Sequence, residues 1–370
     1  MKILWVFSSF EIGGAQRRFA DLAGVMEGEW RHIVTSMIGR YDAKTLLPSG
    51  VQIDAHPINF QNGPFLSTAN INAMKKALGD IAPDLLVTHN WGSIEWRIAN
   101  REIKIPHVHI EDGFGPGGAE AAMTHRRSMA RRVLFSRAGT GHERYAFIAP
   151  SQTMARIFEK SWGVEKARVN AIPNGVDTAA YQSVLSPEDR PGFVIGAIGA
   201  LRPEKRFDRL LRVAAPVLKS DRVRLLILGD GPERGAISRL ADALGVAAQV
   251  EFAGMVSDVA ARLADMDVVV NTSDTEQMPL SLIEAMAAGK AIVATDVGDV
   301  AAMLSEENRD FVFATTEEAA MTTALRSLLD NSARARAIGK ANAQKAASDY
   351  ALDAMASRYA AVFEDVAGSD

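Results

Sequence analysis

The sequence predicts an α/β protein built from two doubly wound domains, each with a parallel sheet covered by helices. Short apolar runs of strand length alternate with amphipathic helical stretches, which is typical of βα units. The pattern occurs twice, on either side of a stretch at residues 178–192 that carries two prolines and little periodicity. A chain of 370 residues is also long enough to form two hydrophobic cores.

The apolar runs give the order of the elements. The strands predicted in the first half cover residues 3–8, 32–37, 85–89, 107–110 and 145–149. Those of the second half cover residues 193–199, 223–229, 249–253, 268–271 and 291–295, and an amphipathic helix follows at residues 350–367. We therefore expect a first domain at residues 1–180, a linker at 181–192, a second domain at 193–348 and a C-terminal helix at 349–370.

Composition excludes several classes of function. The formal net charge of -4 supplies no global attraction to nucleic acid. The absence of cysteine excludes disulfides, thiolate metal sites and cysteine nucleophiles, which fits a reducing, cytoplasmic location. The apolar start at residues 3–7 lacks the features of a signal peptide, and no later run reaches the roughly 18 apolar residues of a spanning helix. We expect those first residues to form a core strand.

Two loops of the first half are candidate sites, because open α/β sheets bind ligands beyond the carboxyl ends of their strands. Gly13 and Gly14 follow the first strand and open a helix, either as a phosphate-facing turn or as a purely structural one. Glu111 and Asp112 follow the strand at residues 107–110. Two adjacent acids at this place repel each other and lose solvation, which is unfavourable unless a ligand binds to them. The alternative is a solvated acidic turn without a ligand.

Cations gather where the first helix of the second half begins. Arg202 and Lys205 lie at the expected helix start, although positive charge there opposes the helix macrodipole. A bound diphosphate would relieve this conflict, since both the cations and the free amides would face an anion. Arg206 and Arg209 are predicted to be solvated residues on the helix surface.

The next strand ends in GDGPERGA, which is close to a dinucleotide-binding fingerprint with one residue too many. It contains Gly229, Gly231 and Gly235. Glu251 follows at about the sequence separation expected for an acidic residue that binds the ribose. A nicotinamide-dependent oxidoreductase is therefore an alternative function, although it would use this loop only.

The most informative segment is SDTEQMPLSLIEAMAAGKAIVATDVGD. Glu276 precedes a short loop, and Ser281 with Glu284 three residues later forms a predicted capping box at the start of a helix. The free amides of such a helix can hold phosphate, and the two carboxylates can accept hydrogen bonds from sugar hydroxyls. The residues expected at the donor between the two glutamates are Gln277, Met278, Pro279, Leu280 and Ser281.

With these residues, the sequence resembles the retaining GT-B glycosyltransferases of family 4. Glu276 and Glu284 match that family's E-x7-E motif, and EAMAAGKAIVATDVG is similar to its usual continuation. Four further pieces lie in the family's order: GGAQRR, IPNGVD, RPEK and GDGP. The resemblance implies a GT-B fold, with two Rossmann-like domains that face a cleft, residues 174–177 closing the first domain and the last helix returning to it.

The resemblance also implies a function: transfer of a sugar, with retention, from a nucleoside diphosphate sugar to a hydroxyl of a glycan, lipid-linked or small-molecule acceptor. Glu276 then contacts the donor sugar and Glu284 the ribose, while Arg202 and Lys205 take the diphosphate charge, so that neither a metal nor a further cofactor is needed. Gly13, Gly14, Gly229 and Gly231 are assigned to donor binding as well. A nucleotide-sugar epimerase of the same fold is the second alternative.

The chain departs from the family at three positions. Ala200 replaces the usual phosphate-binding arginine, so Arg202 is expected to serve from two positions later. Gln277 follows the first glutamate where many members have glycine, which predicts a polar sugar pocket. Asp112 replaces a first-domain histidine, so Glu111 and Asp112 are assigned to the acceptor side, and retention and inversion both stay open.

A basic stretch between these sites is a candidate for contact with a membrane. Residues 126–137 combine apolar side chains with Arg126, Arg127, Arg131, Arg132 and Arg137 on an expected helix. Such a helix can dock peripherally on an anionic membrane, which would suit a lipid-linked acceptor, or it can be a solvated face over a core.

Overall fold

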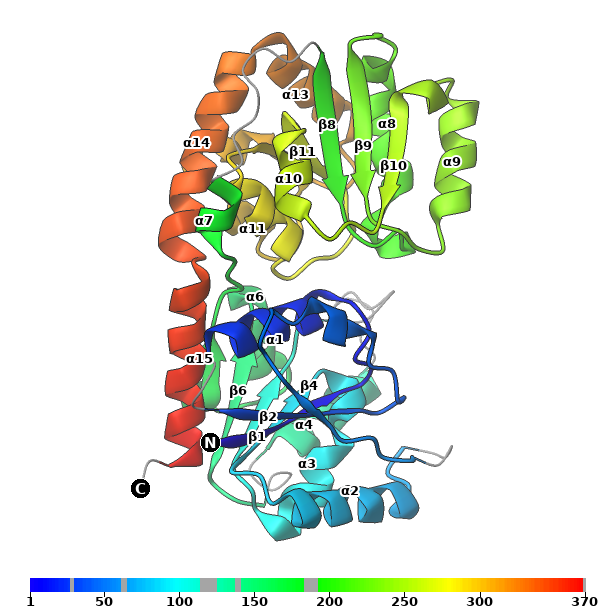
Figure 1. Cartoon of the computed structure of the whole chain (residues 1–370). Coiled ribbons are helices and arrows are strands. Elements are labelled where there is room, and N and C mark those ends of the chain that lie inside the picture. The colour runs from blue at the N-terminus through cyan, green and yellow to red at the C-terminus, as the bar shows by residue number, and fades with distance from the viewer. Residues whose placement is uncertain (27–29, 61–64, 114–124, 137–140, 183–191, 369–370) are drawn as a thin grey trace. The chain divides into compact units, whose positions relative to one another are not determined.

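The computed structural model describes residues 1–26, 30–60, 65–113, 125–136, 141–182 and 192–368. These residues form two compact units, which are treated separately below. Of the described residues, unit 1 contains 1–113, 125–173 and 352–368, and unit 2 contains 174–182 and 192–351. Figure 1 labels the elements of both units.

Unit 1 is a parallel sheet of seven strands in the order β3-β2-β1-β4-β5-β6-β7. The strands are β1 (Lys2–Phe7), β2 (Arg31–Ser36), β3 (Asp54–Ala55), β4 (Leu85–His89), β5 (His107–Ile110), β6 (Tyr145–Ala149) and β7 (Val169–Ala171). The main helices are α1 (Gly14–Val25), α2 (Thr68–Ile81), α3 (Glu95–Ile103), α4 (His125–Phe135) and α6 (Gln152–Arg156). All residues of β4 and β5 are buried, as expected for inner strands of a sheet covered on both faces.

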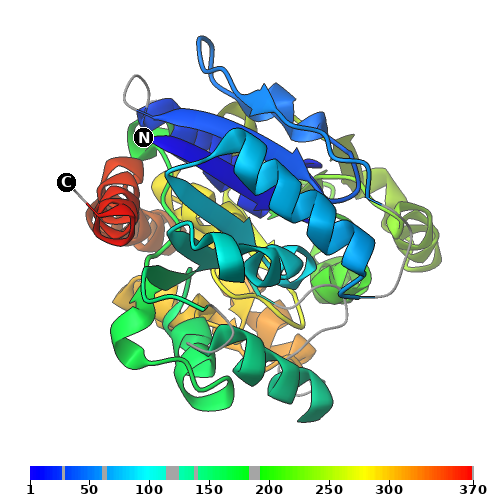
Figure 2. The same cartoon turned by 90° about the horizontal axis from the view of Figure 1, so that it is seen from below.

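The C-terminal helix α15 (Leu352–Ala367) also belongs to unit 1. The ring of Phe363 contacts Trp5 of β1 and Trp30, at centroid distances of 5.6 and 5.7 Å, and Tyr359 is fully buried. Figure 2 shows α15 in red, viewed along its axis, beside the blue N-terminal strand. The last helix therefore completes the core of the unit that contains the first strand.

Unit 2 is a second parallel sheet, with six strands in the order β10-β9-β8-β11-β12-β13. The strands are β8 (Phe193–Ile198), β9 (Val223–Leu228), β10 (Val250–Gly254), β11 (Val268–Asn271), β12 (Ala291–Thr295) and β13 (Val312–Phe313). The helices are α7 (Thr178–Gln182), α8 (Phe207–Leu218), α9 (Arg234–Ala243), α10 (Val259–Ala264), α11 (Leu280–Ala287), α12 (Val300–Met303), α13 (Glu318–Asp330) and α14 (Ser332–Asp349).

The boundary between the units differs from the prediction of a first domain ending at residue 180. Residues 174–182 pack in unit 2, where the Asn174 side chain donates a hydrogen bond to the Met278 carbonyl and Tyr181 is buried. The first residues of the expected linker, 181 and 182, therefore form the end of α7. Residues 183–191 lie outside the described part of the chain. Composition suggested a linker because it does not reveal such long-range contacts.

In each sheet the strand order changes direction at one point, between β1 and β4 in unit 1 and between β8 and β11 in unit 2. The loops that leave the two adjacent strands at such a point diverge to opposite faces of the sheet, and ligands of open α/β folds bind in the space between them. The candidate residues after β8 and β11 are therefore brought to the same edge of unit 2.

Candidate active site

The centre of the unit 2 site is an ion pair between Lys205 and Glu276. Lys205 ends a 3-10 turn that follows β8, Glu276 follows β11, and their Nζ and Oε1 atoms lie 2.6 Å apart. Two further side chains donate to the same carboxylate oxygen: Ser273 Oγ at 2.7 Å and Asn271 Nδ2 at 3.4 Å. The Glu276 side chain is 8% exposed and that of Lys205 is 26% exposed. The carboxylate is thus held in place while the cation stays accessible.

Glu284 lies on α11, about one turn after the helix begins at Leu280, in a different environment. Its side chain is buried, and Oε1 accepts a hydrogen bond of 3.0 Å from the Tyr181 hydroxyl. The predicted capping box is wrong: Pro279 precedes the helix, and Ser281 is already its second residue. The Pro279 carbonyl accepts the amides of Leu282 and Ile283, and no side-chain hydrogen bond caps the helix at Pro279.

The start of α11 suits an anion. The first amides of a helix lack partners within it, and here those of Leu280 and Ser281 precede the amides that bond to Pro279. Helix N-termini of this kind bind phosphate through free N–H groups and the helix dipole. The carboxylates of Glu276 and Glu284 lie on either side of this segment in sequence. The amides can therefore bind the phosphate of a ligand, and the carboxylates can accept hydrogen bonds from the hydroxyls of its sugars.

The loop between the two glutamates is shaped by contacts that the sequence pattern did not indicate. The Met278 side chain is buried in the core, and its carbonyl accepts Asn174 Nδ2 at 2.7 Å. The Gln277 carbonyl accepts the Asp299 amide at 3.2 Å. Asn174 thus anchors this loop of unit 2, which corrects the expectation that residues 174–177 close the first domain.

Gly298 allows a close approach beneath Glu276. Its φ is +59°, and a Cβ added there would lie 2.0 Å from the Glu276 carbonyl oxygen. Only glycine therefore fits at this position without moving the loop. This steric requirement explains the glycine of the DVG sequence at residues 296–298.

The three arginines near the start of α8 differ from one another. Arg202 is exposed at the turn that carries Lys205. Arg206 pairs with Asp208 and Asp274 at 2.9 Å each. Arg209 is buried and bonds Asp274 at 2.7 Å, so the prediction that it is a solvated helix residue is wrong. Arg206 and Arg209 fix the loop after β11, whereas Arg202 remains available for a ligand.

Gly229 and Gly231 are packed against the backbone of the loop after β8. A Cβ on Gly229 would lie 2.0 Å from the Gly199 carbonyl oxygen, and one on Gly231 would lie 2.6 Å from that of Leu201. These glycines therefore permit the loop after β9 to contact the loop after β8, which leads into the turn that carries Arg202.

Glu251, the expected ribose ligand of an oxidoreductase, is exposed on β10 and pairs with Arg262 at 2.6 Å. The GDGPERGA loop therefore has a packing role, and its carboxylate partner is engaged elsewhere. No contact described in this loop favours the oxidoreductase alternative over a function based on the site around Glu276.

In unit 1, Asp112 lies at the carboxyl end of β5 and is held from three sides. It forms an ion pair with Arg18 of α1, its backbone amide donates to Asn90 Oδ1 at 2.7 Å, and the His89 ring lies 3.7 Å from its second oxygen. Burial alone would raise the pKa of Asp112, but the Arg18 charge and the contact with His89 outweigh it and hold this pKa well below its usual range. Asp112 is therefore a charged hydrogen-bond acceptor and a weak base.

Glu111, its neighbour, is buried to 1% exposure, and its Oε2 lies 3.4 Å from His109 Nε2. Burial raises the pKa of Glu111 to about 8, although the charge of Arg131 opposes this shift. The two adjacent acids thus differ: Asp112 can meet a ligand, and Glu111 supports the turn from inside.

Gly13 and Gly14 form the start of α1 in the same unit. Gly13 has an extended backbone immediately before the helix, and α1 begins at Gly14. A Cβ on Gly13 would lie 2.8 Å from Gln16 Oε1. The Gln16 side-chain nitrogen in turn donates to the Ser9 carbonyl at 2.7 Å. Both glycines follow β1, which ends at Phe7, and their assignment to donor binding stays a prediction.

The basic segment forms helix α4 as far as Phe135, and its two arginines with described side chains differ in environment. The Arg131 guanidinium is buried between the rings of Trp91 and Trp162, at 4.3 and 4.9 Å from their centroids. Arg132 is exposed, as are two apolar residues, Met129 and Val133. The side chains of Arg126 and Arg127, and all of Arg137, lie outside the described part of the structure.

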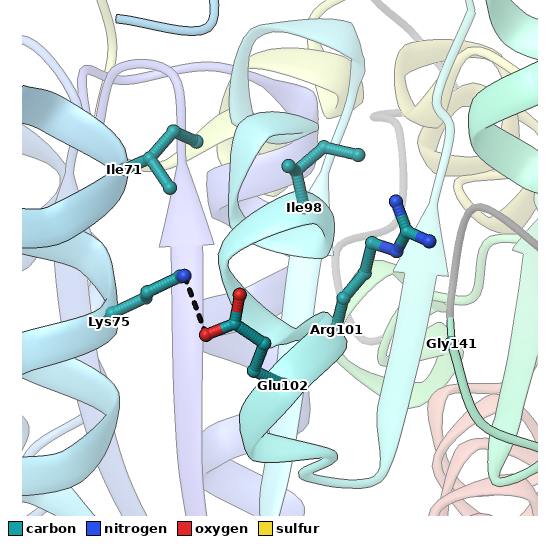
Figure 3. A pocket seen from close by; sticks show the side chains of 6 residues that line it. All are labelled: Ile71, Lys75, Ile98, Arg101, Glu102 and Gly141. Carbon is teal, nitrogen blue, oxygen red and sulfur yellow. Dashed lines mark hydrogen bonds and ion pairs between the residues drawn. The ribbon is translucent and has the colours of Figure 1, made fainter. Parts of the chain in front are cut away.

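Unit 1 also has a surface pocket of about 490 Å³ between α2 and α3. Figure 3 shows its lining, in which Lys75 and Glu102 form an ion pair of 2.8 Å beside Ile71 and Ile98. Glu102 ends α3 before the amino end of β5, so this part of the pocket is remote from the ligand-binding edge of the sheet. We do not assign the reaction to it.

Within the residues that the structure describes, no group of three or more acidic or histidine side chains is arranged to hold a metal ion.

Comparison with known proteins identifies the family and the fold. A family model described as Glycosyltransferase Family 4 matches residues 12–180, and one described as Glycosyl transferases group 1 matches residues 192–331. The structure is similar to that of HepE from Anabaena in complex with UDP and glucose, with a TM-score of 0.82, 21% identity and 98% coverage of both chains. It is also similar to WaaG, with a TM-score of 0.74, 17% identity and coverage of 98% and 99%. The fold and the site thus define a GT-B glycosyltransferase.

Curated relatives narrow the family. The chain is 26% identical over 312 residues to the D-inositol 3-phosphate glycosyltransferase of Gordonia bronchialis, covering 77% of this chain and 67% of that protein. It is 33% identical over 229 residues to the phosphatidyl-myo-inositol mannosyltransferase of Mycobacterium tuberculosis, covering 57% and 58%. The chain belongs to the glycosyltransferases of the family 4 type, as its motifs indicated.

Proposed function

We propose that this glycosyltransferase uses a nucleoside diphosphate sugar as donor, bound in unit 2. The single observation that carries the proposal is the ion pair between Lys205 and Glu276 at the point where the strand order of the sheet changes. In this proposal the accessible Lys205 ammonium, the Arg202 side chain and the amides at the start of α11 bind the diphosphate. The Glu276 carboxylate accepts a hydrogen bond from the donor sugar, and Glu284 accepts one from the ribose.

The reaction follows from this division of charge. As the bond between the anomeric carbon and the phosphate oxygen breaks, negative charge grows on the leaving diphosphate, and Lys205 and Arg202 stabilise it. These side chains would balance the charge that a metal ion carries in other enzymes, so we propose that no metal is needed. Positioning and electrostatics supply most of the acceleration.

We propose that the acceptor hydroxyl binds at Asp112 and that the anomeric configuration is retained. The depressed pKa of Asp112 supports this, because a carboxylate stabilised by Arg18 is a poor proton acceptor. Asp112 is then suited to hold the hydroxyl, and the leaving phosphate takes the proton on the same face. A general base on the opposite face would instead give inversion.

The experiment that tests the function is a donor screen. Nucleoside diphosphates and their sugars are added to the protein in a thermal-shift assay, because ligands of the native state raise the melting temperature. The best donor is then incubated with alcohols, glycans and inositol-containing acceptors, with and without EDTA. We expect an acceptor-dependent product that EDTA does not diminish and whose anomeric proton coupling matches that of the donor. A changed sugar formed without any acceptor would instead indicate an epimerase.

We further propose that α4 contacts an anionic membrane surface, which would bring the enzyme to a lipid-linked acceptor. The exposed side chains of Met129, Arg132 and Val133 support this, since apolar residues beside a cation suit a lipid interface. Among the described helices, none has the length and apolar character needed to cross a bilayer. Sedimentation with vesicles containing anionic lipid should be reduced by Val133→Asp, and equal sedimentation of the two proteins would contradict the proposal.

A further inference from the structure

A chain of hydrogen bonds lies buried behind the turn that carries Asp112, and its members come from α3, β4 and β5. Thr88 of β4 is central: its Oγ1 lies 2.7 Å from His107 Nε2 and 2.8 Å from His109 Nδ1. Arg97 of α3 lies 3.4 Å from His107 Nδ1. At the other end, His109 Nε2 lies 3.4 Å from Glu111 Oε2.

All five side chains are buried to within 1% exposure. Burial holds the pKa values of His107 and His109 well below the usual range, so both rings are neutral. A neutral imidazole has one N–H donor and one acceptor nitrogen, and a threonine hydroxyl has one hydrogen to donate. The number of protons on the two rings and the hydroxyl is therefore fixed, and only their directions have to be found.

The direction follows from Arg97, because a guanidinium can only donate. His107 Nδ1 must accept from it, so the proton of His107 is on Nε2 and is donated to Thr88 Oγ1. Because His107 Nε2 is then a donor, His109 Nδ1 is the acceptor that remains for the Thr88 hydroxyl, which places the proton of His109 on Nε2. That proton points at Glu111 Oε2. With this one set of directions, every hydrogen of the two rings and the hydroxyl has an acceptor.

We propose that this one-way chain, from Arg97 through His107, Thr88 and His109 to Glu111, positions the turn at residues 111 and 112 for the acceptor hydroxyl. This inference rests on the proposed role of Asp112. Glu111 is joined directly to Asp112, and its backbone amide donates to the Ile148 carbonyl of β6. Orienting the Glu111 side chain from inside therefore sets where Asp112 stands at the edge of the sheet.

Thr88 is a positioning residue in this account, since it is fully buried and two bonds removed from Glu111. Thr88→Val keeps the shape of the side chain but removes both hydrogen bonds, whereas Thr88→Ser keeps the hydroxyl. Thr35 provides a matched control in β2 of the same sheet: it is equally buried, and its hydroxyl donates to the His56 carbonyl at 2.7 Å, away from any histidine ring. Thr35→Val removes a buried hydroxyl without touching the chain.

The first measurement is the tautomeric state of the rings, read from long-range 1H–15N correlations of 15N-histidine-labelled full-length protein. Substitution of each ring in turn assigns the signals. We expect both His107 and His109 to carry the proton on Nε2 in the wild type and His109 to lose this preference in Thr88→Val. A wild-type proton on Nδ1 of either ring would overturn the proposed direction.

The second measurement is sugar transfer beside binding of UDP. We expect Thr88→Val to lower kcat for transfer roughly tenfold or more, since small displacements at a reacting group are costly, while the Kd for UDP stays at the wild-type value. Thr88→Ser should restore the rate, and Thr35→Val should change it little. Equal losses in Thr88→Val and Thr35→Val would overturn the positioning role. If the wild type transferred no sugar, the proposed function would fail, whereas the tautomers would still decide whether the chain exists.

Discussion

Each unit places a cation beside a carboxylate at the ligand-binding edge of its sheet, but the two pairs expose opposite partners. In unit 2 the Lys205 side chain is 26% exposed and Glu276 is 8% exposed. In unit 1 Arg18 is 2% exposed and Asp112 is 19% exposed. A ligand that reaches unit 2 therefore meets the cation first, which suits a phosphate, and one that reaches unit 1 meets the carboxylate, which suits a hydroxyl. This difference supports the proposal that unit 2 binds the donor and unit 1 the acceptor.

The largest effect is expected at Glu276. Glu276→Gln keeps the size of the side chain but removes the charge that faces the donor sugar, so we expect kcat to fall on the order of a hundredfold. Binding of the free nucleoside diphosphate should change much less. Asp274→Asn is the matched control, because Asp274 lies in the same loop and pairs with Arg206 and Arg209 instead.

If Asp274→Asn lowered turnover as much as Glu276→Gln, the effect would belong to the loop and not to the carboxylate at Lys205. Both variants are therefore compared at matched stability, measured by thermal unfolding.

A smaller effect is expected at Glu284, and it should appear in binding. Glu284→Ala should weaken nucleotide binding by about 1.5 to 3 kcal/mol, the usual contribution of a hydrogen bond to a charged group. Tyr181→Phe removes only the hydroxyl that orients Glu284 and should cost about 1 kcal/mol. Isothermal titration with the nucleoside diphosphate that the donor screen selects gives both values. Wild-type affinity in Glu284→Ala would exclude the ribose contact.

Asp112→Asn should have a still smaller effect on turnover. If Asp112 only accepts a hydrogen bond, the amide oxygen replaces it and most of the activity remains. A general base would instead lose roughly a hundredfold or more. The variant leaves Arg18 buried without its carboxylate, so we expect a stability loss of about 3 to 5 kcal/mol, and assays belong at low temperature.

An Arg18→Gln, Asp112→Asn double variant restores charge balance and serves as the control. The anomeric coupling of the product is read by nuclear magnetic resonance in both variants. An inverted product would contradict the assignment of Asp112 as a hydrogen-bond acceptor.

Glu111 should affect stability as a function of pH and have the smallest effect on turnover. Its pKa is raised from 4.5 to about 8 in the folded state, so the folded protein binds this proton more tightly than the unfolded chain. Its contribution to stability is therefore fully present below pH 4.5 and is lost as the pH rises to about 8. Arg131, Asp112 and the Trp91 backbone all face this carboxyl and enter the same balance.

Glu111→Gln cannot titrate but keeps an oxygen that accepts from His109. Its unfolding free energy should decline less between pH 5 and pH 8 than that of the wild type, by on the order of a few kcal/mol. Chemical denaturation at several pH values measures this. Parallel pH profiles of the two proteins would show that Glu111 does not titrate as described.

The long apolar strands were predictable from the sequence, and the short ones were not. β4, β5, β11 and β12 are continuous buried runs, and their predicted bounds agree with the structure. The strands β3, β7 and β13 were missed because they contain only two or three residues at or near the edges of the sheets. A run of that length has no measurable periodicity.

The site shows the same division. Lys205, Glu276 and Glu284 stand in local motifs, so the sequence singled them out. Tyr181 and Ser273 act through contacts that no spacing reveals, and Gly298 through a close backbone approach. The prediction for Arg209 was wrong because its partner Asp274 comes from a loop 65 residues away.

The most direct test of the account is calorimetric binding of the nucleoside diphosphate that the donor screen selects, and of its nucleoside, to the wild type, Lys205→Ala and Arg212→Ala. Arg212 lies on α8 of the same unit and pairs with Glu318 and Asp208, so its variant controls for the loss of one positive charge. If Lys205 binds the diphosphate, Lys205→Ala should lose about 1.5 to 3 kcal/mol of affinity for the nucleoside diphosphate, whereas its affinity for the nucleoside and both affinities of Arg212→Ala stay near the wild type. Equal losses for the two ligands in Lys205→Ala, or no loss at all, would contradict a donor site at this edge of unit 2.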